Sequence, residues 1–126
     1  VAARLASRTN AELRAMGLRL ATAATALRSS VEWVVTNSGD KTRLVHVAAV
    51  PYLKLWGLVV GGWQMGRAAL VAAERLERSD GDLGFLRAKL VTARYYAESI
   101  LPQAEGLALT ITEGSSAALV LAAEEF

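Results

Sequence analysis

The side chains best suited to catalysis in this sequence are few and do not form a set. His46 is the only histidine, and no carboxylate or cysteine lies at a ligand spacing around it, which favours a structural or solvent-facing role. No serine lies in a nucleophile-elbow pattern, and a histidine without a paired acid argues against a catalytic triad. The sequence therefore predicts no catalytic residue, no cofactor-binding residue and no metal site.

Two cationic side chains and a tyrosine give the sequence one candidate binding edge. Lys89, Arg94 and Tyr95, beside the aromatic Tyr96, would present charge and a hydroxyl group to an anionic, for example phosphorylated, ligand. Glu98 follows Arg94 by four residues, a spacing typical of an ion pair on a solvated helix face. An anion contact and an ordinary exposed helix face are thus both open interpretations.

The segment 44–76 carries two apolar stripes at helical spacing. Members of the second stripe lie within about 60° of one another and about 100° from the first, because successive residues of a helix rotate by about 100°. Two apolar faces imply two neighbours. The second is either another helix of the same bundle or a surface outside it, a parent domain or a twin subunit, where large aromatic residues act as anchors. The candidate interface residues are Tyr52, Trp56, Val59, Trp63 and Leu70.

Four glycines interrupt the middle of the same segment: Gly57, Gly61, Gly62 and Gly66. Each destabilises a helix interior by about 1 kcal/mol relative to alanine, so close approach of another backbone or side chain is the expected compensation. A phosphate-binding loop is disfavoured, because no strand precedes the glycines and the surrounding pattern stays helical. We expect a neighbouring helix to cross here.

The elements that must position these residues are three helix-length stretches with apolar residues at alternating three- and four-residue steps. They predict an all-α fold, an up-and-down bundle of three long helices plus a short C-terminal helix, in a single domain spanning residues 1–126. The first helix is expected from Asn10, as N-cap, to about Val35, with residues 1–9 either continuing it or forming a linker. Gly39 is expected to end it in a left-handed conformation.

Prolines complicate the second and third helices. Pro51 predicts either a kink in the second helix or a helix that begins near Val50. The third helix, capped by Asp80 or Asp82, is expected to run from about residue 83 to 113 with a bend one turn before Pro102. A closing helix over residues 117–125 is expected, with Ser115 or Ser116 as its cap.

Composition limits the classes of partner. The net charge of +2 comes from 14 basic and 12 acidic residues scattered through the chain, so no nucleic-acid surface is predicted. The absence of cysteine suits a cytoplasmic protein. Lys54 and Arg67 bound the most apolar stretch at twelve residues, short of a membrane span. Because the chain starts at Val1 without a signal-like segment, it is interpreted as a fragment of a larger protein.

Several ordered segments resemble a known family. These are residues 51–63 (PYLKLWGLVVGGW), Lys89, residues 93–98 (ARYYAE) and residues 101–104 (LPQA). Together they resemble the extra C-terminal helical domain of long acyl-CoA dehydrogenases, over about residues 47–126. Before Val47 only a compatible long helix is present.

The resemblance implies a parent enzyme of fatty acid metabolism that uses FAD to oxidise an acyl-CoA thioester. In that family a glutamate removes the α-proton and hydride leaves the β-carbon for the flavin, but those parts lie upstream, so no catalytic or flavin-binding role falls on a residue of this chain. The implied partners are the upstream catalytic domains of the same polypeptide, with homo-oligomerisation expected. The isolated chain is expected to be inactive.

Two other function classes fit the same residues. A free-standing helical oligomerisation or interaction module would use the two-faced second helix equally well. Binding of an apolar ligand or a membrane surface would use the same Trp56 and Trp63 stripe.

Overall fold

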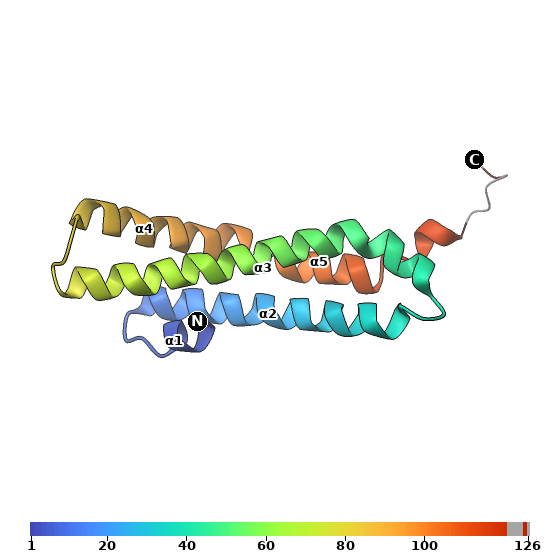
Figure 1. Cartoon of the computed structure of the whole chain (residues 1–126), viewed down its shortest axis with the longest axis horizontal. Coiled ribbons are helices and arrows are strands. Elements are labelled where there is room, and N and C mark those ends of the chain that lie inside the picture. Colours follow the sequence, from blue (N-terminus) through green and yellow to red (C-terminus); the bar gives the residue numbers. More distant parts are fainter. Residues whose placement is uncertain (121–124, 126) are drawn as a thin grey trace.

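Three antiparallel rods of helix, joined by short turns, make up the protein (Figure 1). The computed structural model describes residues 1–120 and 125. Within them no strand occurs, and the predicted all-α, up-and-down bundle is confirmed. The elements are α1 (Ala2–Ala6), α2 (Ala11–Asn37), α3 (Thr42–Glu77), α4 (Leu83–Tyr95), a π-helical segment η1 (Tyr96–Ile100), α5 (Gln103–Thr112) and a 3₁₀ turn η2 (Ala117–Leu119).

The first rod, α2, begins where the sequence predicts. The side-chain oxygen of Asn10 accepts hydrogen bonds from the backbone N–H groups of Glu12 and Leu13, at 2.9 and 3.1 Å, which satisfies two of the free donors of the first turn. The prediction for its other end was wrong: Gly39 does not have a positive φ. The chain instead turns in right-handed conformation, and the Thr42 hydroxyl donates to the carbonyls of Ser38 and Gly39.

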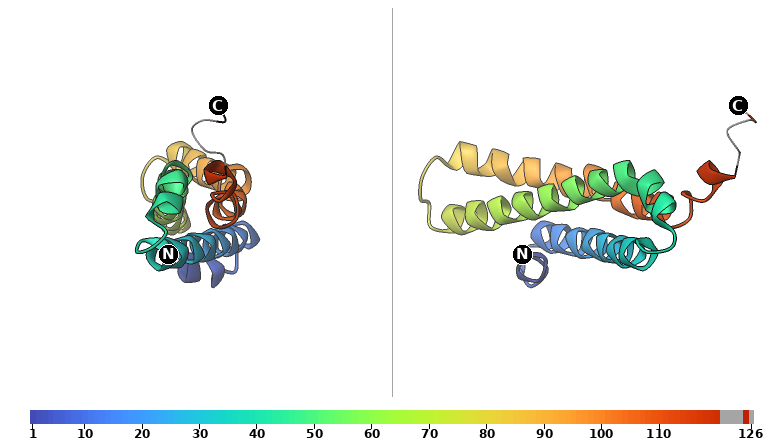
Figure 2. Two further views of the ribbon diagram at one scale, coloured as in Figure 1. Left: turned by 90° about the vertical axis from the view of Figure 1, so that its right-hand side faces the viewer. Right: turned by 45° about the vertical axis from the view of Figure 1, so that its right-hand side comes forward.

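Residues 2–6 neither extend α2 nor form a plain linker. They make the separate helix α1, which folds back onto α2 and reaches α3 (Figure 2). Ser7 and Arg8 interrupt the helix: the Ser7 hydroxyl donates to the Arg4 carbonyl, and the Arg8 N–H bonds to Leu5 in a tighter turn. Leu5, the inward side chain of α1, is only 1% exposed.

The second rod, α3, is a single helix from Thr42 to Glu77, and Pro51 lies inside it. The alternative of a helix beginning near Val50 was therefore wrong. Pro51 removes one backbone donor from the helix, but it is half-buried on the face that carries the neighbouring core residues Ala48 and Leu55. Tertiary packing of a long apolar stripe outweighs the local loss.

The third rod is continuous from α4 through η1 to α5, and it changes geometry just before Pro102. A proline in a regular helix clashes with the carbonyl four residues earlier and lacks the N–H that would bond to it. Here the wider π-turn of η1 precedes Pro102, with the Leu101 N–H bonded to the Tyr96 carbonyl at 3.0 Å, five residues back. The predicted bend one turn before Pro102 is thus a π-helical segment.

The turn between the second and third rods settles which aspartate is the cap. Asp82 accepts a hydrogen bond from the Phe85 N–H at 3.0 Å, whereas Asp80 pairs with Arg75 at 3.2 Å. Among the described residues, the positive φ values lie in this turn, at Ser79 (52°) and Gly81 (96°). At Gly81 the absence of a Cβ makes that conformation accessible.

Only part of the predicted closing helix, residues 117–125, lies within the described residues. Residues 117–119 form a 3₁₀ turn, and residues 121–124 of the predicted closing helix lie outside the described residues. Neither predicted cap acts as one. The Ser115 hydroxyl is buried and donates to the Ile111 carbonyl at 3.0 Å, and Ser116 makes no side-chain cap bond.

The core lies along the line where the three rods meet. Along the first and third rods, apolar residues at three- and four-residue steps are buried or half-buried, because such a repeat keeps one side of a helix facing its neighbours. The most completely buried large side chains are Leu5, Leu55 and Ile111. One comes from α1 and one each from α3 and α5, so α1 belongs to the core as much as the long rods do.

Candidate functional site

An exposed apolar face runs along α3, on the side turned away from the core. Its large side chains fall within about 80° of one another on the helix, since each residue rotates by about 100°. We define the outer face by these residues, with their exposed fractions: Leu53 74%, Trp56 41%, Val60 44%, Trp63 42% and Val71 55%. Five large apolar side chains exposed on one side of one helix are typical of an interaction surface.

The structure divides the predicted interface stripe. Val59 and Leu70 are 7% and 3% exposed and pack in the core of the chain, so the part of the stripe able to meet a partner is Trp56 and Trp63. Tyr52 is half-buried and meets Trp56 edge-on, with the ring centroids 6.4 Å apart. The boundary of the core runs through this stripe, and the helical wheel alone does not locate that boundary.

The outer face carries a positive charge at Arg67. The guanidinium carbon of Arg67 lies 4.9 Å from the centroid of the Trp63 ring. Arg67 forms no ion pair within the described part of the chain, and Glu74, which lines the same groove, is already bonded to Arg4 and Arg8. Arg67 is bonded only to the side-chain oxygen of Gln64, at 3.4 Å. The face therefore offers an apolar surface with an uncompensated cation.

The residues of the predicted anion contact do not converge. Arg94 is bound by two carboxylates, Glu98 at 2.7 Å and Glu12 at 2.5 Å. The pKa of Arg94 is raised above its ordinary value, mainly by the hydrogen bond to Glu98 and then by the charges of Glu12 and Glu98. Lys89 lies over the Phe85 ring at 5.1 Å, in a different groove. Tyr95 is exposed beside Arg94. An anion would have to displace Glu12 and Glu98 from Arg94.

The glycines of α3 mostly meet the expected close neighbours. A methyl group on Gly62 would lie 2.6 Å from Leu101 Cδ2, and one on Gly61 would collide with the Tyr96 hydroxyl. A methyl group on Gly66 would meet α1, 2.8 Å from Val1 Cγ1. The prediction was wrong for Gly57, which has nothing within 4 Å and faces solvent among the residues of the outer face.

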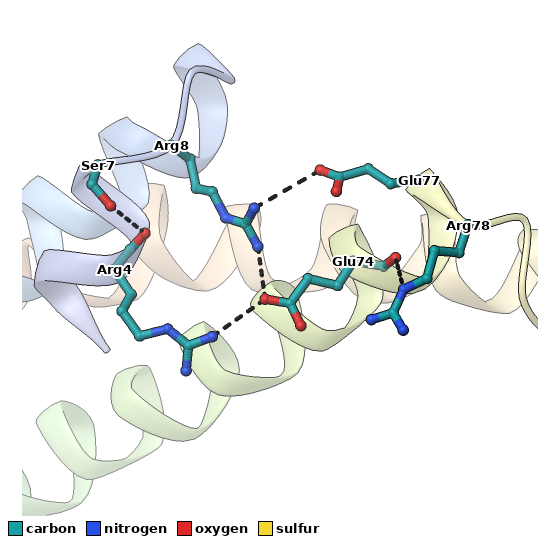
Figure 3. A network of polar contacts seen from close by, with 6 residues as sticks. All are labelled: Arg4, Ser7, Arg8, Glu74, Glu77 and Arg78. Atoms are coloured by element: carbon teal, nitrogen blue, oxygen red, sulfur yellow. Dashed lines mark hydrogen bonds and ion pairs between the residues drawn. The ribbon is translucent and has the colours of Figure 1, made fainter.

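A polar network that the sequence did not reveal ties α1 to α3 (Figure 3). The Glu74 carboxylate accepts from Arg8 at 2.8 Å and from Arg4 at 3.2 Å, and Arg8 also approaches Glu77 at 4.0 Å. These pairs join residues about seventy positions apart, so no local spacing could have indicated them. The outer-face residues Leu53, Val60 and Val71 were missed as well, although extending the Trp56–Trp63 spacing by three- and four-residue steps would have found them.

No cluster of three or more histidine, cysteine, aspartate or glutamate side chains able to hold a metal ion occurs in the described residues. His46, the histidine considered above, is exposed near the start of α3. An open groove of about 450 Å³ lies between α2 and α5. It is lined in part by Thr22, Thr25 and Thr112, whose hydroxyl groups already donate to backbone carbonyls.

By length and composition α3 could cross a membrane: it is the helix in the described part of the chain that passes this test, with a mean hydropathy of 1.6 over its most apolar 18 residues. The expectation that this chain has no membrane span, which rested on Lys54 and Arg67 bounding the apolar stretch, stays a prediction. Only 22% of the 18-residue stretch is buried within the chain. The opposite side of α3 nevertheless packs on α2, α4 and α5.

Comparison with known proteins gives two matches. Residues 1–122 match the family model described as "Acetyl-CoA dehydrogenase C-terminal like". Over 107 residues the chain is 31% identical to the 3-methylmercaptopropionyl-CoA dehydrogenase of Ruegeria pomeroyi. The matched region covers 85% of this chain and 18% of that relative. No solved structure matches the chain.

Proposed function

Because this chain belongs to the family of acetyl-CoA dehydrogenase C-terminal-like domains, we propose that it is the helical C-terminal domain of an FAD-dependent acyl-CoA dehydrogenase. In this proposal the domain packs against the catalytic body or joins subunits of a homo-oligomer, and it does not carry out the oxidation by itself. The enzyme is proposed to be cytoplasmic and to act in fatty acid metabolism.

The lengths of the matched regions support a domain of a larger enzyme. The chain spans 18% of the length of the relative, which is named as a dehydrogenase of an acyl-CoA thioester. Most of such a protein lies outside the matched region. The groups that bind flavin and remove the substrate proton are therefore proposed to lie in the remainder of the parent polypeptide.

The described residues do not fit a flavin. An isoalloxazine ring needs an enclosed cleft with free polar groups aimed at its edge. The groove of about 450 Å³ between α2 and α5 is open, and its threonine hydroxyl groups are already bonded. No buried side-chain polar atom lacks a hydrogen-bond partner in the described part of the chain. We accordingly assign no step of the reaction to this domain.

The observation that carries the assembly role is the outer face of α3. A domain that stood alone in water would expose Leu53, Trp56, Val60, Trp63 and Val71 along one side of a helix whose opposite side is already packed. Scattered exposed apolar residues need no explanation, but a continuous row suits a surface that another protein surface covers.

Expression of the complete reading frame that contains this sequence tests the proposal. The full-length protein should show the absorbance of stoichiometric oxidised flavin and should bleach it on addition of an acyl-CoA, whereas residues 1–126 alone should show neither. A full-length protein without flavin, or a reading frame confined to this domain, would favour a free-standing oligomerisation module instead. Stoichiometric flavin on residues 1–126 alone would contradict the non-catalytic assignment.

A further inference from the structure

The N-terminal end of α1 lies against the outer face of α3. Val1 and Arg4 line a groove of about 250 Å³ together with Trp63, Arg67 and Val71. Val1 also packs on Gly66, where a methyl group would lie 2.8 Å from its Cγ1 atom. A polypeptide that preceded Val1 would therefore leave the domain beside two members of the outer face.

Helix α1 is fixed in this position by packing as well as by charge. Leu5 is buried, and Gly17 of α2 approaches α1 so closely that a methyl group there would lie 2.5 Å from the Ala6 nitrogen. Figure 3 shows Arg4 and Arg8 of this segment turned toward the Glu74 carboxylate of α3. The direction in which a preceding chain arrives is thus set by the domain itself.

The charges of the outer face disfavour a second copy as its cover. An antiparallel pairing that aligns the two outer faces, with Leu53 of one copy level with Val71 of the other, would place Arg67 level with Gly57 and give it no carboxylate partner. A parallel pairing would place Arg67 opposite itself. Like charges at a contact are unfavourable, and a cation that becomes buried needs a carboxylate partner. A different surface, apolar and carrying an acidic side chain, complements this face better.

From these observations, and resting on the proposed function, we propose that the outer face of α3 is the docking surface for the catalytic body of the same polypeptide. Helix α1 delivers the preceding chain to the end of the face that carries Trp63 and Val71. The opposing surface is apolar, and it carries an aspartate or glutamate that pairs with Arg67 in place of the weak bond to Gln64.

Thiol labelling tests this in the full-length protein, since the domain contains no cysteine of its own. We would compare Val60→Cys, on the outer face, with Val91→Cys, which is 67% exposed on α4, and follow each labelled peptide by mass spectrometry. Docking predicts that Cys at position 60 reacts about tenfold more slowly in the full-length protein than in residues 1–126 alone, because access then requires local opening. The rate at position 91 should be the same in both.

A pair of charge reversals tests the proposed acidic partner. Arg67→Glu in the full-length protein should restore fast labelling at position 60, because two carboxylates would then face each other, and Arg67→Lys should retain the protection. Arg87→Glu, an equal reversal on the exposed side of α4, should leave it unchanged. Unchanged helicity by circular dichroism would show that each variant is folded.

Three results would overturn the proposal. Protection of position 60 in residues 1–126 alone that grows with protein concentration would assign the face to a second copy. Protection by vesicles of phosphatidylcholine and phosphatidylglycerol would assign it to a membrane surface. Fast labelling at position 60 in a full-length protein that does contain flavin would reject the docking surface while leaving the proposed function intact. A full-length protein without flavin would instead reject the function, whatever the labelling rate.

Discussion

At the scale of single residues, the contact between α3 and the third rod depends on one hydroxyl group and on side chains that pack directly over glycines of α3. The Tyr96 hydroxyl donates to the Leu58 carbonyl at 3.0 Å, directly over Gly61. Leu101 fills the space over Gly62. Tyr96 is the first residue of the π-helical segment η1, and Leu101 follows the last one. The altered geometry before Pro102 therefore also places the two side chains that pack over Gly61 and Gly62.

Replacing Gly57 or Gly62 of α3 with alanine should change the free energy of unfolding in opposite directions. Gly62→Ala forces a methyl group against the buried Leu101 side chain, so it should lower the free energy of unfolding by about 1–3 kcal/mol through overpacking. Gly57→Ala meets open space and should raise it by up to about 1 kcal/mol through helix propensity. Urea denaturation of residues 1–126 measures both, and equal effects would contradict the assigned packing.

Tyr96 should make the protein sensitive to alkali. Burial raises the pKa of Tyr96 above its ordinary value, because the phenolate is poorly solvated there. Its stabilising contribution is therefore complete below the ordinary pKa of about 10 and is lost as the pH rises through the raised folded-state value. Tyr96→Phe should be less stable than wild type by about 1 kcal/mol at pH 7, and the difference should shrink above pH 10.

The control for that titration is Tyr95→Phe, since Tyr95 is 62% exposed. It should leave the pH dependence of the unfolding free energy unchanged. A difference between Tyr96→Phe and wild type that stays constant from pH 7 to pH 11 would show that the Tyr96 phenol does not ionise with unfolding.

At the scale of elements, side-chain caps rather than apolar patterning decide where the first and third rods start. Asn10 and Asp82 both place a side-chain oxygen on free N–H groups of the first helical turn. The turn before Asp82 contains the positive φ values found in the described part of the chain, at Ser79 and Gly81. A short connection of this kind brings α3 and α4 together as an antiparallel hairpin, which extends beyond α2 at the left of Figure 1.

The two aspartates of this turn make a matched pair of variants. Asp82→Ala removes the cap of α4 and should lower stability by about 1 kcal/mol. Asp80→Ala removes only an exposed ion pair with Arg75, an interaction worth between about 0 and 1 kcal/mol that salt should weaken further. Thermal denaturation at low and high salt separates them; a larger loss for Asp80→Ala would reverse the assigned roles.

At the scale of the whole molecule, α3 is the central element, with the core on one side and an unpaired apolar face on the other. It contacts α1, α2, α4 and α5, and only 22% of its most apolar stretch is buried within the chain. The bundle is thus incompletely covered along one helix. A domain of a larger assembly is expected to leave such a surface uncovered. This surface is the outer face of α3, which we proposed as the docking surface for the catalytic body.

Trp63→Ala should distinguish an outward tryptophan from a core residue. Because Trp63 is 42% exposed, the variant should keep its helicity and lose much less than the about 3–5 kcal/mol typical of a buried tryptophan. Leu55→Ala, at a fully buried position of the same helix, should lose about 2–5 kcal/mol. Circular dichroism with chemical denaturation compares the two. A Trp63→Ala variant that unfolds would place this side chain in the core.

The sequence alone determined the three rods, their inward seams and the family, because helical periodicity, caps and ordered motifs are properties of short stretches of chain. It could predict that Gly62 meets a neighbour and that Pro102 alters its helix. It could not predict which member of the second stripe of α3 stays outside. Val59 and Trp63 are four residues apart on one helix, yet one is buried and the other exposed.

Only the tertiary structure decided that boundary, together with the docking of α1 through Leu5 and the Arg4–Arg8–Glu74 network. The physical reason is that burial depends on how many neighbours pack around a helix and at which rotation, and those neighbours come from distant parts of the chain. A helix records in its own sequence that it has an apolar side; how much of that side its own chain covers is a property of the assembled bundle.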